Sequence, residues 1–273
     1  MKVKEIPKSL YCQFRLRATP VKKLKNSSQP EAPLVVSLTS IPERIRSVDL
    51  VIRSLLKQRL LPEQIVLWLP ESLQGHIPDS LKSLEHGRFR IAFSPLTCPH
   101  KKLIHSLEEF PGNPIVTCDD DLMYPPGWLE KLYRTHLEYP KDIVGHQIRY
   151  IRYAEDGTLL PYPQWVVPQD GGSNPKAFMA VGAGGVLYPP GSLDPRVQDR
   201  QLFLKLSPRA DDLWFKVMGL LAGTRVRAAL EASGEPVPIL GSQKTSLKKT
   251  NINKDKNRVQ WEQLTEYFGL HPL

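Results

Sequence analysis

The stretch Pro114–Leu129, PIVTCDDDLMYPPGWL, indicates both the fold and the place of a ligand site. Ile115–Cys118 is a short β-favouring run with the composition of a buried strand. Three consecutive acids, residues 119–121, follow it, and the Pro125–Gly127 turn precedes a helix-like run. Three adjacent carboxylates repel one another, whereas a divalent cation would neutralise them; the alternative is a solvated acidic turn. Because open α/β sheets bind ligands at strand ends, we expect a site here.

The composition fits a globular protein with one large α/β domain or two small ones. The chain has 273 residues, of which 41% are hydrophobic and 24% charged. No apolar run approaches the roughly 18 residues of a spanning helix, and the chain start lacks a signal-peptide block. Three cysteines without metal-ligand spacing favour a reduced compartment. We therefore expect a cytoplasmic protein.

Positive charge gathers near the two ends of the chain. The net charge is +9, with eight Lys or Arg in residues 1–25 against Glu5 alone, and six in residues 241–258 against Asp255 alone. This distribution favours anionic partners, which include nucleotide phosphates, an anionic membrane surface and nucleic acid. An ordinary solvated surface is the alternative for either run.

Strand-like and helix-like segments alternate along the chain. Strands are predicted at residues 34–38, 65–69, 89–93, 115–118, 143–153 and 226–229, and helices at residues 44–58, 78–86, 101–110, 128–139, 213–221 and 259–268. The alternation predicts βαβ units and a mostly parallel sheet. Residues 1–32 are expected to form a basic, weakly structured extension, and residues 155–177 a hairpin or a long functional loop.

Four segments appear in an order that resembles a known enzyme family. They are VVSLTSIPER (residues 35–44), IVTCDDDLMYPPGWL (115–129), AVGAGGVLY (180–188) and RADDLWF (209–215). Together they resemble the nucleotide-sugar glycosyltransferases of the GT-A type, close to the family-2-like bacterial enzymes.

The resemblance implies an α/β fold: a single GT-A-like domain with a mostly parallel, Rossmann-like central sheet and helices on both faces. The domain would span residues 33–273, with a nucleotide-binding half at 33–125, an acceptor-binding half at 126–240, and a basic loop and closing helix at 241–273.

The resemblance also assigns site residues. Nucleotide-sugar binding falls to Thr39, Ser40, Pro42, Arg44, Lys101, Lys102, Asp119 and Asp120. A Mn²⁺ or Mg²⁺ ion falls to Asp119, Asp120 and Asp121. The acceptor side falls to Trp165, Gly184 and Gly185. The catalytic base falls to Asp211 or Asp212, with Asp211 slightly favoured.

Several of these residues have ordinary alternatives. Asp211 and Asp212 could cap a helix, Arg44 and the two lysines could be solvated, and Trp165 could belong to the core. The chain also departs from the family pattern. Its three acids are consecutive rather than acid-x-acid, so the metal-binding pair is open, and Ala210 stands where relatives often have Glu, which leaves the register of the base open.

The function expected is metal-dependent, inverting transfer of a sugar from a UDP- or GDP-sugar to a glycan or lipid-linked acceptor. The resemblance points to bacterial surface polysaccharide or lipopolysaccharide synthesis, with peripheral contact at the inner face of the membrane. A nucleotidyltransferase is the first alternative, but it would need a glycine-rich loop that Thr39–Arg44 lacks. A basic nucleic-acid-binding protein is the second, but it leaves the acids unexplained, and no nucleic acid partner is expected.

Overall fold

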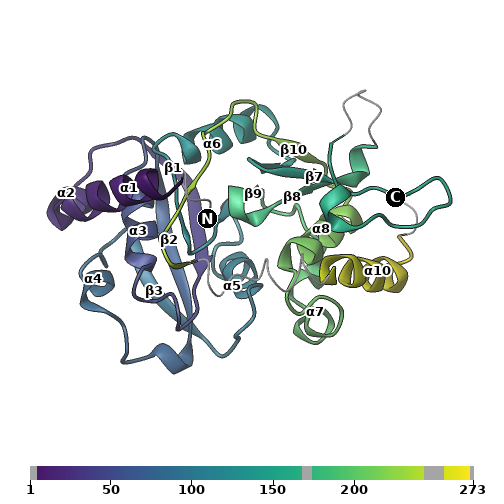
Figure 1. The fold of residues 1–273 in the computed structure, drawn as a ribbon, viewed down its shortest axis with the longest axis horizontal. Helices are drawn as coiled ribbons and strands as arrows, with labels where there is room; N and C mark the ends of the chain where they lie inside the picture. The colour runs from purple at the N-terminus through teal and green to yellow at the C-terminus, as the bar shows by residue number, and fades with distance from the viewer. Residues whose placement is uncertain (1–4, 168–173, 243–254, 271–273) are drawn as a thin grey trace.

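A seven-stranded sheet forms the centre of the molecule (Figure 1). The structure is a computed structural model that describes residues 5–167, 174–242 and 255–270. The strand order is β10–β6–β9–β4–β1–β2–β3. The bounds are β1 (Glu31–Thr39), β2 (Leu61–Pro70), β3 (Phe89–Ser94), β4 (Ile115–Thr117), β6 (Ile143–Gly145), β9 (Val186–Tyr188) and β10 (Val226–Ala228). Only β9 runs antiparallel to its neighbours in this sheet, so the prediction of a mostly parallel sheet is confirmed.

Two small antiparallel ribbons accompany the main sheet. One pairs β5 (Leu122–Met123) with β11 (Val237–Pro238), and the other pairs β7 (Ile148–Tyr150) with β8 (Phe178–Ala180). The first ribbon begins directly after the three acids. It therefore joins the end of β4 to a segment more than 110 residues further along the chain.

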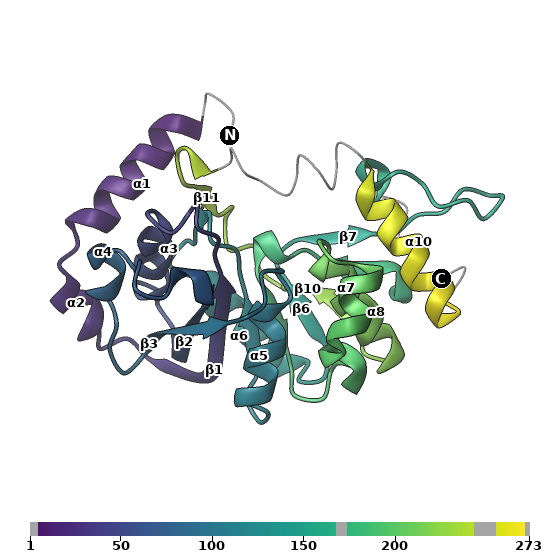
Figure 2. The same ribbon diagram turned by 90° about the horizontal axis from the view of Figure 1, so that it is seen from below.

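Helices cover both faces of the sheet, as predicted. One group comprises α1 (Ile6–Ala18), α2 (Val21–Lys25), α3 (Val48–Leu55), α4 (Asp79–Lys82) and α6 (Trp128–Glu138). The other comprises α5 (Lys101–Glu109), α7 (Arg200–Leu206), α8 (Asp211–Leu221) and α10 (Lys256–Phe268). Figures 1 and 2 show α1 to α4 at one end of the molecule and α7, α8 and α10 at the other.

The alternation of side chains in the strands produces two hydrophobic cores. In β1, Leu34 and Val36 pack with the first group of helices, whereas Val35 packs with the second. Such alternation follows from the two-residue period of a strand. Because both faces are covered, the strands read as continuous apolar runs in the sequence.

Some elements differ from the sequence-based prediction. The segment expected as a weakly structured extension contains α1 and α2, which is a correction. Ser9 and Gln13 of α1 are buried, and Arg53 Nη1 donates to the carbonyl oxygens of Leu16 and Thr19. These tertiary contacts hold a helix whose own sequence has no apolar stripe facing the core.

Other differences concern the boundaries. The expected strand at 143–153 is two short strands, β6 and β7, and the expected helix at 44–58 is confined to α3. Within the expected loop at 155–177, short 3₁₀ turns lie at Tyr162–Gln164 and Pro175–Ala177. Further 3₁₀ turns lie at Glu71–Leu73, Gly182–Gly184 and Pro195–Gln198. Most of the predicted basic loop, residues 243–254, lies outside the described residues. In the part of the chain that is described, no helix has the length and apolarity needed to cross a membrane.

Candidate active site

A cavity of about 1500 Å³ lies at the carboxyl ends of β1 and β4. Its walls come from the loop after β1, the β4–β5 turn, the start of α5, the β6–β7 connection, the loop around Trp165, the start of α8 and β11. Parallel strands bring their carboxyl ends to one edge of the sheet, and ligands bind at that edge. The cavity therefore gathers segments from both predicted halves of the domain.

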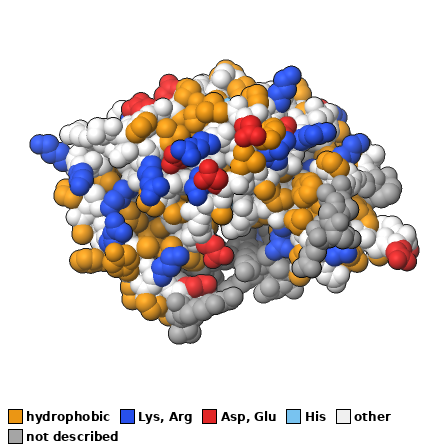
Figure 3. Space-filling view, turned by 90° about the horizontal axis from the view of Figure 1, so that it is seen from above, with side chains coloured by type: hydrophobic (Ala, Val, Ile, Leu, Met, Phe, Trp, Pro, Cys, Tyr) orange, Lys and Arg blue, Asp and Glu red, His pale blue; other side chains and the backbone are white. Residues whose placement is uncertain are grey.

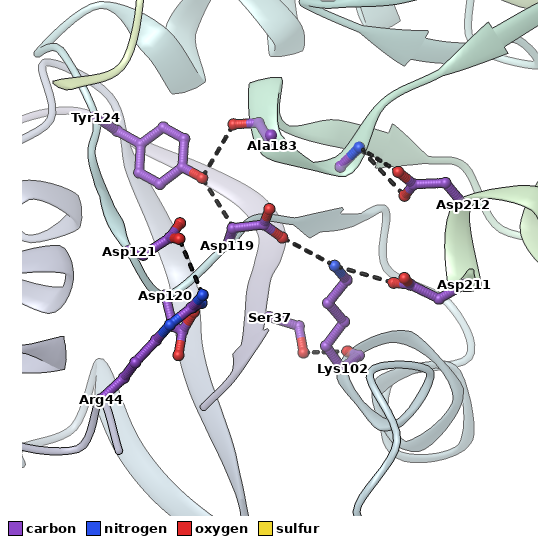
Figure 4. Close-up of polar contacts among 11 residues, drawn as sticks. Ser37, Arg44, Lys102, Asp119, Asp120, Asp121, Tyr124, Ala183, Asp211 and Asp212 are labelled. Atoms are coloured by element: carbon purple, nitrogen blue, oxygen red, sulfur yellow. Dashed lines mark hydrogen bonds and ion pairs between the residues drawn. The ribbon is translucent and has the colours of Figure 1, made fainter. Parts of the chain in front are cut away.

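Arg44 balances two of the three strand-end acids (Figure 4). Its Nη1 atom donates to Asp120 at 2.5 Å, and its Nη2 atom lies 3.3 Å from Asp121. Ser40 Oγ donates to the other oxygen of Asp120 at 2.6 Å. Burial raises the pKa of Asp120, although Arg44 and Ser40 oppose the shift, and the acids raise the pKa of Arg44 against its own desolvation. Both carboxylate oxygens of Asp120 are thus committed to protein partners.

Lys102 joins the strand-end acids to the acids of α8. Its Nζ atom lies 3.1 Å from Asp119 and 3.0 Å from Asp211. Burial alone would lower the pKa of Lys102, but Asp211 and Asp119 raise it well above its ordinary value. In the reverse direction, burial opposes ionisation of Asp211, yet the attraction of Lys102 keeps the pKa of Asp211 below the ordinary range. Asp211 is therefore an ionised partner of Lys102.

Asp212 has a different environment from its neighbour. The backbone N–H of Gly182 donates to its two oxygens at 3.2 and 3.1 Å. A Cβ atom at position 182 would lie only 2.8 Å from Asp212 Oδ1, so this close approach needs glycine. Burial, and then repulsion from Asp211, raise the pKa of Asp212 to about 7. A carboxylate with this pKa is suited to accept a proton near neutral pH.

Two aromatic side chains fasten the glycine-rich loop to the acidic turn. Tyr124 Oη accepts from the backbone N–H of Asp119 at 2.9 Å and donates to the carbonyl oxygen of Ala183. Trp128 Nε1 donates to the carbonyl oxygen of Gly184 at 2.7 Å. Gly185 has φ 95°, and a Cβ atom there would lie 2.4 Å from the Trp128 ring. These contacts fix the glycine-rich loop against the segment that follows β4.

Most of the predicted site residues line the cavity. Those that do are Thr39, Ser40, Arg44, Lys102, Asp119, Asp120, Asp121, Trp165, Asp211 and Asp212. Trp165 is also fully buried, and its Nε1 atom donates to the carbonyl oxygen of Leu160. Trp165 therefore belongs to the hydrophobic core and also lines the cavity.

The remaining predicted residues lie elsewhere. Pro42 is exposed outside the cavity wall. Lys101 is buried, and its Nζ atom donates to the carbonyl oxygen of Leu96, so it turns away from the cavity. Gly184 and Gly185 do not line the cavity but contact Trp128, Gly184 through its carbonyl oxygen and Gly185 through its close approach to the ring.

The sequence did not reveal two residues of the site. Tyr124 is a buried residue outside the cavity lining, and an aromatic side chain three residues after the strand-end acids was the one local signal that could have indicated it. Arg149 lines the cavity with its guanidinium carbon 4.5 Å from the centre of the Tyr162 ring. It comes from β7, and no local pattern in the sequence marks it.

The acids suit a hard cation only in combination with a ligand. Across the described ranges, no three His, Cys, Asp or Glu side chains converge to form a metal cluster. Ser40 and Arg44 engage both oxygens of Asp120, whereas the ion pairs of Asp119 with Lys102 and of Asp121 with Arg44 are longer, at 3.1 and 3.3 Å. Asp119 and Asp121 are therefore the carboxylates best placed to bind a cation. Mg²⁺ is commonly bound through one or two carboxylates plus substrate phosphates. The donor set therefore fits an ion that binds together with a diphosphate.

Comparison with known proteins identifies the family. The model described as glycosyl transferase family 2 matches residues 45–180, about half of the chain, and this segment contains the strand-end acids. No curated protein matches the chain.

Similar solved structures include S. aureus TarS 1–349, with 12% identity and a TM-score of 0.46 over 75% of this chain and 59% of that one. The same protein in complex with UDP has 12% identity and a TM-score of 0.45 over the same shares of the two chains. The 4-diphosphocytidyl-2C-methyl-D-erythritol synthase from Anaerococcus prevotii has 10% identity and a TM-score of 0.42 over 85% of this chain and 96% of that one. The alignment thus spans 59% of the length of the TarS structure. On the family match, the chain belongs to glycosyl transferase family 2.

Proposed function

We propose that this glycosyltransferase moves a sugar from a UDP- or GDP-sugar to an acceptor hydroxyl with inversion at the anomeric carbon. One observation carries the proposal: a single cavity holds two cations paired with strand-end acids and, on α8, the half-buried carboxylate of Asp212. The cations suit a diphosphate leaving group, and the carboxylate suits an acceptor hydroxyl.

Arg44 and Lys102 are the proposed donor-side cations. Each is held by two acids, so each has a fixed position before a substrate arrives. Asp119 and Asp121 would hold a Mg²⁺ or Mn²⁺ ion together with the diphosphate oxygens. Such an ion would neutralise the negative charge that develops on the leaving diphosphate.

Asp212 is the proposed general base. As the acceptor oxygen bonds to the anomeric carbon, the bond from that carbon to the diphosphate breaks, and the hydroxyl proton passes to Asp212. The pKa of about 7 supports Asp212 for this role, whereas Asp211 is held ionised by Lys102. This assignment reverses the slight preference for Asp211 that the resemblance suggested.

The proposed acceptor lies on the side of Arg149, Tyr162 and Trp165. Aromatic faces and a guanidinium group can stack on a sugar ring and bind its hydroxyls. The resemblance to bacterial enzymes supports a surface polysaccharide or lipopolysaccharide as the product, made at the cytoplasmic face of the membrane from a glycan or lipid-linked acceptor.

A panel of UDP- and GDP-sugars with Mn²⁺ tests the proposal through transfer or slow hydrolysis. With the active donor, Asp212→Asn should lower kcat by about 100-fold or more, because general-base catalysis contributes about that much. The dissociation constant for the donor should stay unchanged. Asp199→Asn is a matched control, because Asp199 caps α7 outside the cavity. The proposal would be contradicted if Asp212→Asn kept the wild-type kcat, or if the enzyme turned over none of the sugar nucleotides in the panel.

A further inference from the structure

Helix α1 presents an apolar stripe to solvent. Leu10 is 50% exposed, Tyr11 59% and Phe14 72%. At 100° per residue these three side chains fall on one side of the helix. Lys8 and Arg15 run along one edge of the stripe, and Arg17 runs along the other. On the left of Figure 3, the side on which Figure 1 draws α1, Lys and Arg side chains are interspersed with hydrophobic ones.

The amphipathic arrangement of α1 is the reverse of that in an ordinary surface helix. Its buried face carries Ser9 and Gln13 together with Leu16. Ser9 Oγ donates to the carbonyl oxygen of Pro238 at 2.6 Å, and Gln13 Nε2 donates to Ser9 Oγ at 3.0 Å. Arg53 holds the carboxyl end of the helix, as described above. The helix is thus docked through polar contacts, with its apolar side turned outward.

The surroundings of the stripe are strongly positive. Residues 6–30 contain six Lys or Arg and no Asp or Glu. The pKa of Lys57, which hydrogen-bonds to Thr19, is lowered by burial and by the charges of Arg15 and Lys23. A second copy of the chain would bring the same positive charge to this face, which opposes self-association. An anionic bilayer offers the opposite charge together with an apolar interior.

We propose that α1 binds the surface of an anionic phospholipid bilayer, with Leu10, Tyr11 and Phe14 inserted at the boundary between headgroups and acyl chains. Lys8, Arg15 and Arg17 then face the lipid phosphates. The buried face of α1 contacts Pro238, which lines the cavity. Membrane binding would hold that rim of the cavity about one helix diameter, ~10 Å, from the lipid surface.

Membrane binding through inserted apolar side chains can be distinguished from attraction by charge alone, and it does not depend on the proposed glycosyl transfer. Screening shortens the reach of charges from about 10 Å at 0.1 M salt to about 3 Å at 1 M. A purely electrostatic contact is then released, whereas inserted apolar side chains retain part of the binding.

Co-sedimentation of the full chain with vesicles of phosphatidylcholine and phosphatidylglycerol (7:3) tests this proposal. We expect binding at low salt, weaker binding at 1 M NaCl, and little binding to phosphatidylcholine alone. The variant L10S/Y11S/F14S should bind at least about tenfold more weakly at low salt, because apolar burial contributes to the partition. Leu137→Ser is the matched control, since Leu137 is 62% exposed on α6.

A second variant reports insertion directly. Tyr11→Trp adds an exposed indole to a protein whose five tryptophans are at most 8% exposed. Vesicles should shift its emission to shorter wavelength and protect it from iodide quenching.

Four outcomes would overturn the proposal: no binding by the wild type, an equal loss in Leu137→Ser, an indole that stays quenchable when the protein is bound, or a dimer that the triple substitution disperses. The last outcome would make the stripe an interface between two copies. Donor turnover plays no part in these measurements, so the proposed reaction can fail without affecting them.

Discussion

The replacement of Asp212 by asparagine should stabilise the protein even as it removes activity. In the folded state the pKa of Asp212 is about 7, above its ordinary value of 3.8. Between these pH values the folded protein retains a proton that the unfolded chain has released, so stability falls as the pH rises. The difference of about three pH units corresponds to at most about 4 kcal/mol above pH 7.

Asparagine cannot ionise, so Asp212→Asn avoids this cost. Its advantage over the wild type in the free energy of unfolding should grow by about 2–3 kcal/mol between pH 5 and pH 8. The amide oxygen can still accept from the Gly182 N–H, so the local structure should persist. A site that is more stable without its functional group is expected where catalysis needs a strained environment.

Urea unfolding at pH 5 and pH 8 measures the effect, with the slope of each transition checked for constancy. Asp199→Asn serves again as the control, because asparagine caps a helix as well as aspartate does and should change little at either pH. A stability difference that is the same at both pH values, or a destabilised Asp212→Asn at pH 8, would refute the reasoning. Either result would mean that burial does not oppose ionisation of this carboxylate.

Three further predictions concern the same site. Gly185→Ala should cost about 3 kcal/mol in the free energy of unfolding, from positive φ and from collision with Trp128, whereas Gly157→Ala, with φ 81° in open space within the described structure, should cost only about 1 kcal/mol. Turnover should be lost in EDTA and restored by Mn²⁺ or Mg²⁺, and Asp121→Asn should weaken Mn²⁺ binding in the presence of UDP, as measured by calorimetry; full activity in EDTA would exclude the metal assignment. Arg44→Lys should raise the KM for the donor by about tenfold, because lysine cannot contact two partners through a planar fork; an unchanged KM in steady-state assays would count against a donor-side role.

The sequence predicted the elements that carry strong periodicity. The apolar runs of β1, β2 and β4 and the amphipathic helices α5 and α6 were recognised close to their observed bounds. It missed α1 because that helix turns polar residues inward, against the pattern on which such predictions depend. The short β5 and β11 strands also escaped, because each has only two residues and exists only through pairing.

The site shows the same division. Strand-end acids and the pair at the start of α8 stood out as charge that a fold does not require. The pairing of these acids with Arg44 and Lys102 was not evident in the sequence, because Arg44 lies 76 residues from Asp120 and Lys102 lies 17 residues from Asp119. Lys101 and Lys102 are indistinguishable in the sequence, but successive side chains on a helix point about 100° apart. Lys101 therefore donates to a backbone carbonyl oxygen, whereas Lys102 lies between two acids.

Local sequence is enough to indicate the kind of protein: an α/β sheet with acids at a strand end, and motifs in an order that resembles a glycosyltransferase. Local periodicity and residue chemistry suffice for that, because they act over a few residues. The three-dimensional fold, in contrast, sets which groups meet in the cavity and which of two adjacent carboxylates has its pKa raised to about 7. Burial and charge pairing act through space, and Asp211 and Asp212 differ only in what the fold places beside them: Lys102 next to the first and the Gly182 backbone next to the second.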